Sequence, residues 1–203
     1  MSFKKTKTYR SDFDELKKSI SECTHCRQHL PYPPRPIVQL HPNAKILVIG
    51  QAPGQKAHDS AIPWNDASGN NLRKWMGIEK EIFYDKNKIA LMPMGFCYPG
   101  KNKSGDLPPR PECAELWHQK ILQQLSSVKL TLLIGMYAQK HYLGQNAYNT
   151  LTENVHHFND FLPKYFPLVH PSPRNGIWLS KNTWFEKTAI PVLQKIIRTL
   201  IES

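Results

Sequence analysis

The chain has 203 residues and a formal net charge of +11, because 27 Lys and Arg residues outnumber 16 Asp and Glu residues. No apolar run approaches the roughly 20 residues that cross a bilayer, which excludes a helical integral membrane protein, and the basic N-terminus lacks the apolar core of a signal peptide. We therefore expect a cytoplasmic monomer with a single domain over residues 1–203. Its charge favours a polyanionic partner, of which nucleic acid is the commonest.

The N-terminal region is predicted to form one helix followed by an extended connector. Ser11 is a suitable N-cap, and Phe13, Leu16 and Ile20 recur at helical spacing, so the helix is expected from Ser11 to about Cys23. Residues 30–42 contain five prolines and are expected to run extended along the domain.

Four short, almost entirely apolar runs are predicted to be buried strands, at residues 45–49, 89–92, 130–134 and 166–169. Helices are expected between and after them, at residues 70–76, 111–125, 137–143 and 183–201. Ser68 is the expected N-cap of the first of these helices, and Pro191 should kink or split the last one. This alternation predicts a three-layer α/β/α fold with a central four-stranded, mostly parallel sheet.

Two short loops each follow a predicted strand directly. The first is Gly50-Gln51-Ala52-Pro53-Gly54, and the second is His170-Pro171-Ser172-Pro173. Loops that leave the carboxyl ends of strands in an open α/β sheet meet over one crevice, where ligands bind. One loop permits close backbone approach and the other supplies an imidazole, so we expect the functional site between them.

The four cysteines have a spacing that favours metal binding. Cys23 and Cys26 form a C-x2-C pair, and Cys97 and Cys113 flank a loop rich in Pro and Gly. In a cytosolic chain this arrangement points to a metal rather than to disulfides. Four thiolates suit zinc or a [4Fe-4S] cluster, and the spacing is also compatible with unligated thiols.

The order of these motifs resembles the uracil-DNA glycosylase superfamily, and most of all its iron–sulfur branch, family four. Members of that branch have an early C-x2-C, a strand followed by Gly-Glu-Ala-Pro-Gly, a Pro-Phe segment, two further cysteines sixteen positions apart and a late His-Pro. This chain has the same order, with Pro63-Trp64 in place of Pro-Phe and Cys97 sixteen positions before Cys113. The resemblance implies a uracil-DNA glycosylase-like fold.

The resemblance also implies roles for individual residues. Trp64 would stack on a base flipped out of DNA, His170 would donate a hydrogen bond to it, and the turn after His170 would press into the duplex. The catalytic residues are expected to be His170, Gln51 and Asp59. Base contacts are expected from Gly50, Ala52, Trp64 and Asn102. DNA contacts are expected from Ser68, Gly69, Pro171, Ser172, Pro173, Arg174 and Asn175. The expected ligands of an iron–sulfur cluster, or of zinc as the alternative, are Cys23, Cys26, Cys97 and Cys113.

Three positions depart from the family pattern. Gln51 replaces the glutamate of the first motif, Ala57 stands where an acidic residue is expected, and Pro93 aligns with the asparagine that reads the base edge. The leading hypothesis is a monofunctional DNA glycosylase that acts on uracil or another deaminated base. The alternative is a DNA-lesion-binding member of the same fold with weak or absent catalysis, and a zinc-stapled nucleotide-binding module is a third possibility.

Overall fold

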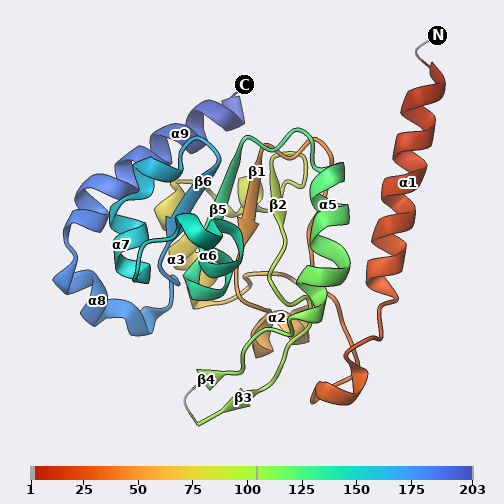
Figure 1. Ribbon diagram of the computed structural model, residues 1–203, viewed down its shortest axis with the longest axis horizontal. Coiled ribbons are helices and arrows are strands. Elements are labelled where there is room, and N and C mark those ends of the chain that lie inside the picture. The colour runs from red at the N-terminus through yellow and green to blue at the C-terminus, as the bar shows by residue number, and fades with distance from the viewer. Residues whose placement is uncertain (1–2, 104, 203) are drawn as a thin grey trace.

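The computed structural model, which describes residues 3–103 and 105–202, is organised around a parallel four-stranded sheet in the order β2-β1-β5-β6 (Figure 1). Its strands are β1 (Ile46–Ile49), β2 (Ile89–Leu91), β5 (Leu130–Ile134) and β6 (Tyr165–Leu168). Every residue of β1, β2 and β5 is buried, which explains why these runs are apolar without alternation. The four predicted strands are confirmed.

Helices cover both faces of the sheet, so the predicted three-layer α/β/α fold is also confirmed. Ile46 and Val48 of β1 point into a core shared with α3 (Ala67–Met76) and α9 (Ile190–Glu202). Leu47 and Ile49 point to the other face, into a core shared with α1 (Phe3–Ser21), α5 (Gln119–Gln124) and α6 (Gly135–Leu143). Figure 1 shows α1 alongside α5. No helix in the described ranges is long and apolar enough to span a membrane.

The remaining elements are short. The further α-helices are α2 (Gln55–Ser60), α4 (Lys80–Phe83), α7 (Leu151–His156) and α8 (Gly176–Lys181). The 3-10 turns are η1 (Arg27–His29), η3 (Gly144–Asn146), η4 (Phe158–Phe161) and η5 (Pro173–Asn175), and the π-helical segments are η2 (Ala114–His118) and η6 (Phe185–Ala189). Two two-residue strands, β3 (Lys101–Asn102) and β4 (Gly105–Asp106), form an antiparallel hairpin.

The predicted start of the first helix was wrong, whereas the predicted interruption of the last helix was correct. The first helix begins at Phe3, so Ser11 lies inside α1 and is not its N-cap. The sequence up to Ser21 contains neither Gly nor Pro, and nothing in it stops the helix from extending towards the N-terminus. The interruption expected at Pro191 is confirmed, because the π-helical segment η6 precedes it and changes the hydrogen-bond spacing there.

The start of α3 also differs from the prediction. Asp66, not Ser68, is the N-cap: its Oδ1 accepts a hydrogen bond of 2.8 Å from the amide of Gly69. Gly69 packs directly against the backbone of Trp64, because a Cβ built on Gly69 would lie 1.8 Å from the carbonyl oxygen of Trp64. The absence of a side chain at Gly69 therefore lets the segment that carries Trp64 rest directly on the helix.

A buried histidine ties α6 to the end of β2. His118 is 2% exposed, and its Nε2 lies 3.2 Å from the carbonyl oxygen of Pro93. Because a carbonyl only accepts, Nε2 carries the proton, and Nδ1 accepts from the hydroxyl of Tyr142 at 2.6 Å. Burial, opposed by the hydrogen bond to Pro93, lowers the pKa of His118 to about 4, so the imidazole is neutral in the folded protein.

We predict that Gly69→Ala lowers the free energy of unfolding by about 1–3 kcal/mol, because its methyl group would overlap the backbone of Trp64. Urea unfolding measures this change. Gly176→Ala is the matched control, because its Cβ meets nothing within 4 Å and its φ of −54° is helical. It should change stability by less than about 0.5 kcal/mol or increase it slightly. Equal losses in the two variants would contradict this account.

The pKa of His118 predicts a pH dependence of folding. Below pH 6.5 the unfolded imidazole binds a proton that the folded one excludes until about pH 4, so stability falls as the pH falls through this window. This group alone contributes a slope approaching about 1.4 kcal/mol per pH unit. The neighbouring titratable groups are His141 and Tyr142. Urea unfolding between pH 7 and pH 4 should show a shallower slope for His118→Gln than for the wild type. Identical slopes would show that His118 is not the responsible group.

Candidate functional site

A cavity of about 450 Å³ opens at the carboxyl ends of β1 and β6, where the sequence placed the functional site. It brings together residues that are far apart in the chain. The predicted site residues that line it are Gly50, Gln51, Ala52, Trp64, Ser68, Asn102, His170, Ser172 and Arg174. The convergence of the two predicted loops is therefore a property of the fold.

Trp64 is held in the cavity by an unusual backbone conformation. Its φ is +57°, in the left-handed region that side-chain-bearing residues seldom adopt. A Cβ built on Gly50 would lie 2.7 Å from Cζ2 of the Trp64 indole, so the ring lies directly on the first loop. The indole of Trp64 therefore packs against Gly50, and its carbonyl group packs against Gly69.

The rings of Trp64 and His170 are neighbours. Their centroids are 6.0 Å apart and their planes are inclined by 31°. A base stacked between two rings needs two contact distances, about 7–8 Å in total. The gap between the two rings is therefore too narrow for a base to stack between them, and both rings line the cavity.

The loop that carries His170 is fixed by two amide side chains. Asn175 Nδ2 donates to the carbonyl oxygen of His170 at 2.6 Å, and Asn71 Nδ2 donates to that of Pro171 at 3.0 Å. Burial lowers the pKa of His170 below the usual histidine value, more than the carboxylates of Asp66 and Asp106 raise it. At neutral pH the imidazole is thus uncharged and carries one N–H donor.

The first loop is fixed to the segment that follows β2. The carbonyl oxygens of Gly50 and Gln51 accept hydrogen bonds from the amides of Met94 and Gly95, at 2.8 Å and 3.0 Å. The side-chain Nε2 of Gln51 donates to the carbonyl oxygen of Leu107 at 3.0 Å. The side chain of Gln51 is therefore oriented by its hydrogen bond to Leu107, the residue that follows β4.

The structure does not bring every predicted residue to the cavity. Asp59 lies exposed on α2, outside the cavity lining, and its Oδ1 accepts from Gln55 Nε2 at 2.8 Å. Gly69 is buried beneath Trp64. The predicted loop residues Pro171, Pro173 and Asn175 shape the second loop without lining the cavity.

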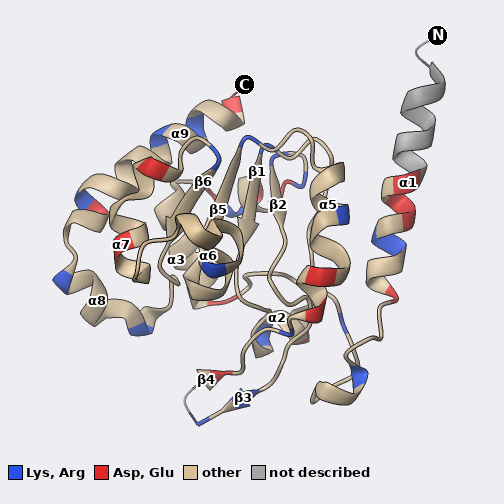
Figure 2. Cartoon of the chain, viewed as in Figure 1, with Lys and Arg blue, Asp and Glu red and all other residues tan. Residues whose placement is uncertain are grey.

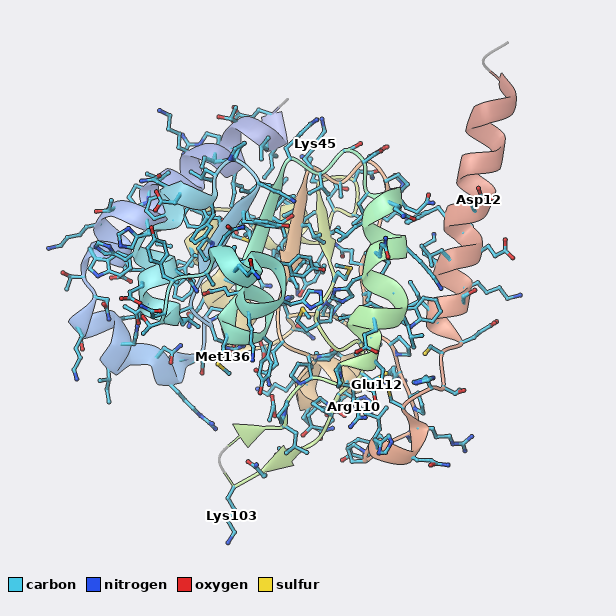
Figure 3. All side chains as sticks on the ribbon, in the orientation of Figure 1. Asp12, Lys45, Lys103, Arg110, Glu112 and Met136 are labelled. Carbon is cyan, nitrogen blue, oxygen red and sulfur yellow. The ribbon has the colours of Figure 1, made fainter. Side chains whose placement is uncertain are left out.

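The hairpin β3–β4 carries the predicted base contact Asn102 and forms one wall of the cavity, but no role was predicted for its Asp106. Lys101, Lys103 and Asp106 on this hairpin and Asp66 at the start of α3 all line the cavity. Figure 2 shows the hairpin projecting from the body, with basic residues on β3 and at the tip and an acidic residue on β4. Lys103 points away from the sheet (Figure 3). Gly100 and Gly105 have φ of +96° and +138°, which glycine adopts readily. The presence of these two glycines in the sequence is the signal that could have indicated a hairpin here.

The four cysteines line a second, much smaller cavity with apolar walls that include Phe96 and Trp117. The amide of Phe96 donates to Sγ of Cys113 at 3.4 Å. Burial raises the pKa of Cys113 to about 12 and that of Cys97 to about 11, so the free thiols are protonated there. Over residues 3–103 and 105–202, no three His, Cys, Asp or Glu side chains are placed so that they could together hold a metal ion. The thiols are brought to one place, but the structure does not show ligation.

Comparison with known proteins identifies a matching family model and similar solved structures. The family model of the uracil DNA glycosylase superfamily matches residues 37–194. A solution NMR structure from Methanosarcina acetivorans, assigned to the uracil DNA glycosylases, is 15% identical, with a TM-score of 0.44 over 80% of this chain and 94% of the other. The crystal structure of wild-type SMUG2 from Pedobacter heparinus is 12% identical, with a TM-score of 0.38 over 96% of this chain and 95% of the other.

The family match covers well over half of the chain. It includes both loops, Trp64 and the hairpin that form the cavity, whereas Cys23 and Cys26 precede it. Family membership supports a DNA glycosylase-type function. On the extent of this match, the chain belongs to the uracil DNA glycosylase superfamily.

Proposed function

We propose that this protein is a monofunctional DNA glycosylase that hydrolyses the N-glycosidic bond of uracil or another deaminated base in DNA. The observation that carries the proposal is that the rings of Trp64 and His170, from distant parts of the chain, lie next to each other in one cavity. This cavity is at the carboxyl edge of a parallel sheet. A stacking surface beside a hydrogen-bond donor is what base excision needs.

The cavity is suited to a base that has left the duplex. Flipping a nucleotide costs a few kcal/mol, least at a mismatched or damaged pair. Stacking on Trp64 would offset roughly 1–3 kcal/mol of that cost. The indole is already held against Gly50, so no ordering of the ring is needed when the base arrives.

His170 would stabilise the departing base. As the glycosidic bond breaks, negative charge develops on the base, and a preorganised N–H donor at its oxygen lowers the barrier. The lowered pKa of His170 keeps the imidazole neutral at the start of the reaction. Its loop is held by Asn71 and Asn175, so the donor is oriented before the base arrives.

Gln51 would help to orient the attacking water. Its Nε2 is engaged with Leu107, which fixes the plane of the amide and leaves the carbonyl oxygen as the acceptor for a water proton. An amide orients water but does not take a proton from it. This limits the part of the chemistry that Gln51 can supply.

The mouth of the cavity would hold the DNA backbone. Lys101, Lys103 and Arg174 line the cavity as cations, and Arg174 is exposed on the second loop, where it would enter the gap left by the flipped base. Ser68, in the first turn of α3, also lines the cavity and would contact a phosphate. We propose that the protein acts on DNA as a monomer.

We also propose that Cys23, Cys26, Cys97 and Cys113 hold a [4Fe-4S] cluster, as in the family-four branch, with zinc as the alternative. What supports this proposal is that four thiols from three segments line one apolar cavity and that the Phe96 amide donates to the sulfur of Cys113. The group would have a structural role. It would fasten the segment after α1 to the loop that leads into the hairpin.

A substrate panel tests the proposed function. Purified protein is incubated with oligonucleotides that carry uracil, hypoxanthine or xanthine, and alkali then cleaves the abasic sites. We expect strand cleavage on at least one of the three and none on undamaged DNA. Binding to these oligonucleotides without cleavage of any of them would instead favour a lesion-binding protein.

In the same assay, we predict that His170→Ala slows excision roughly 100- to 1,000-fold, the effect of losing one preorganised donor. Its affinity for DNA should change little, because the phosphate contacts come from other residues. Trp64→Ala is the companion variant and should weaken binding to DNA with a flipped base. Full activity in His170→Ala would remove this residue from the mechanism.

Metal analysis tests the cysteine proposal. Protein purified without oxygen should contain iron and sulfide, or else zinc, and Cys113→Ser should lose the metal together with thermal stability. Leaving the buried thiols without a ligand should produce the same stability loss in metal-free wild-type protein. Wild-type protein that contains no metal after anaerobic purification, and whose thermal stability does not change when iron and sulfide or zinc are supplied, would contradict the assignment.

A further inference from the structure

The first loop lacks a group that can accept a proton. Gln51 stands where a carboxylate would be expected, and Ala57 is buried and apolar. Hydrolysis of the glycosidic bond needs water to lose a proton as it bonds to the sugar. Among the described residues, two carboxylates line the cavity outside this loop, Asp66 and Asp106, and Asp106 lies on the hairpin β3–β4.

Asp106 on β4 reaches the first loop from outside it. A Cβ built on Gly54 would lie 3.3 Å from Oδ2 of Asp106, so the carboxylate lies over the last residue of the loop. Asp106 lines the same cavity as Gln51 and His170, and it is near enough to raise the pKa of His170. The carboxylate is thus placed at the mouth of the cavity, on the side of the first loop.

The backbone holds Asp106 in this position. The residue after it, Leu107, accepts the side-chain hydrogen bond of Gln51 through its carbonyl oxygen and donates its amide to Gly100 at 2.9 Å. Asp106 is paired across the hairpin with Lys101. Gln51 is therefore hydrogen-bonded to the residue that directly follows Asp106, and both side chains line the cavity.

The other nearby carboxylates are less suited. Asp66 also lines the cavity, but its Oδ1 accepts from the amide of Gly69 and caps α3. Asp59, on α2, lies outside the lining and accepts from Gln55. Asp106 is exposed, so water reaches it.

We infer that Asp106 is the catalytic carboxylate of this enzyme. It takes the role of the acidic residue that the first loop lacks. This inference rests on the proposed glycosylase function. The bond between C1′ and the base nitrogen breaks, and its electron pair leaves with the base. A water oxygen bonds to C1′ while its proton passes to the Asp106 carboxylate and then to solvent. The base anion, held by His170, takes a proton from water.

The carboxylate has a second effect on the same step. The sugar develops positive charge as the base departs, and a fixed negative charge beside it lowers the barrier. Gln51 orients the water through its carbonyl oxygen, and Asp106 accepts the proton. This division of roles explains how a chain with glutamine in the first motif would retain hydrolysis.

The test is single-turnover excision by Asp106→Asn on whichever damaged oligonucleotide the wild type cleaves. We expect the rate to fall roughly 100-fold or more, the usual contribution of a general base. DNA affinity should stay equal or rise, because a negative charge near the phosphates is removed. Asp106→Glu retains the carboxylate and should recover part of the rate. Glu186→Gln, an equal charge change at an exposed residue outside the cavity, is the control.

The outcomes separate this inference from the function it rests on. An active wild type with an equally active Asp106→Asn overturns the role of Asp106 and leaves the glycosylase function intact. Loss of activity in Asp59→Asn but not in Asp106→Asn transfers the role to Asp59 and also overturns it. A wild type that cleaves none of the substrates overturns both.

Discussion

The site depends on the confinement of one indole. Trp64 has a left-handed backbone, its carbonyl group rests against Gly69 of α3, and its ring rests against Gly50 of the first loop. Either glycine would clash with Trp64 if it carried a side chain. Gly69 belongs to α3 and Gly50 is hydrogen-bonded to Met94, so the stacking surface is held in place before any ligand arrives, and the ring centroid of His170 lies 6.0 Å from that of Trp64.

A second constraint is the order of the parallel strands. β1 and β6 are separated by β5, yet their carboxyl ends lie on one edge, so the loop after β1 and the loop after β6 face the same cavity. Hydrogen bonds from Met94 and Gly95 to the first loop connect it to β2 as well. The fold thus supplies the walls, and the hairpin adds charged groups at the mouth.

The sequence predicted the parts of this arrangement that follow from local pattern and topology. The buried strands and the convergence of the two loops were accessible because apolar runs and strand order constrain them strongly, whereas the role of Trp64 was implied only by the family resemblance. The capping of α3 by Asp66 was missed because Ser68 and Asp66 are both good caps, and only the packing of Gly69 decides between them. The short helix α2 inside the long loop was missed, since six residues carry little periodicity. The approach of Asp106 to Gly54 depends on tertiary contacts of the hairpin, which no local pattern encodes.

The most direct measurement of the central claim is a crystal structure of the protein with DNA that contains an abasic site, soaked with the free base released in the substrate panel. The account predicts that the base stacks on Trp64 with an oxygen within hydrogen-bond distance of His170, and that the abasic sugar lies between Gln51 and Asp106. DNA bound on another face of the molecule, or a base bound away from Trp64, would contradict it.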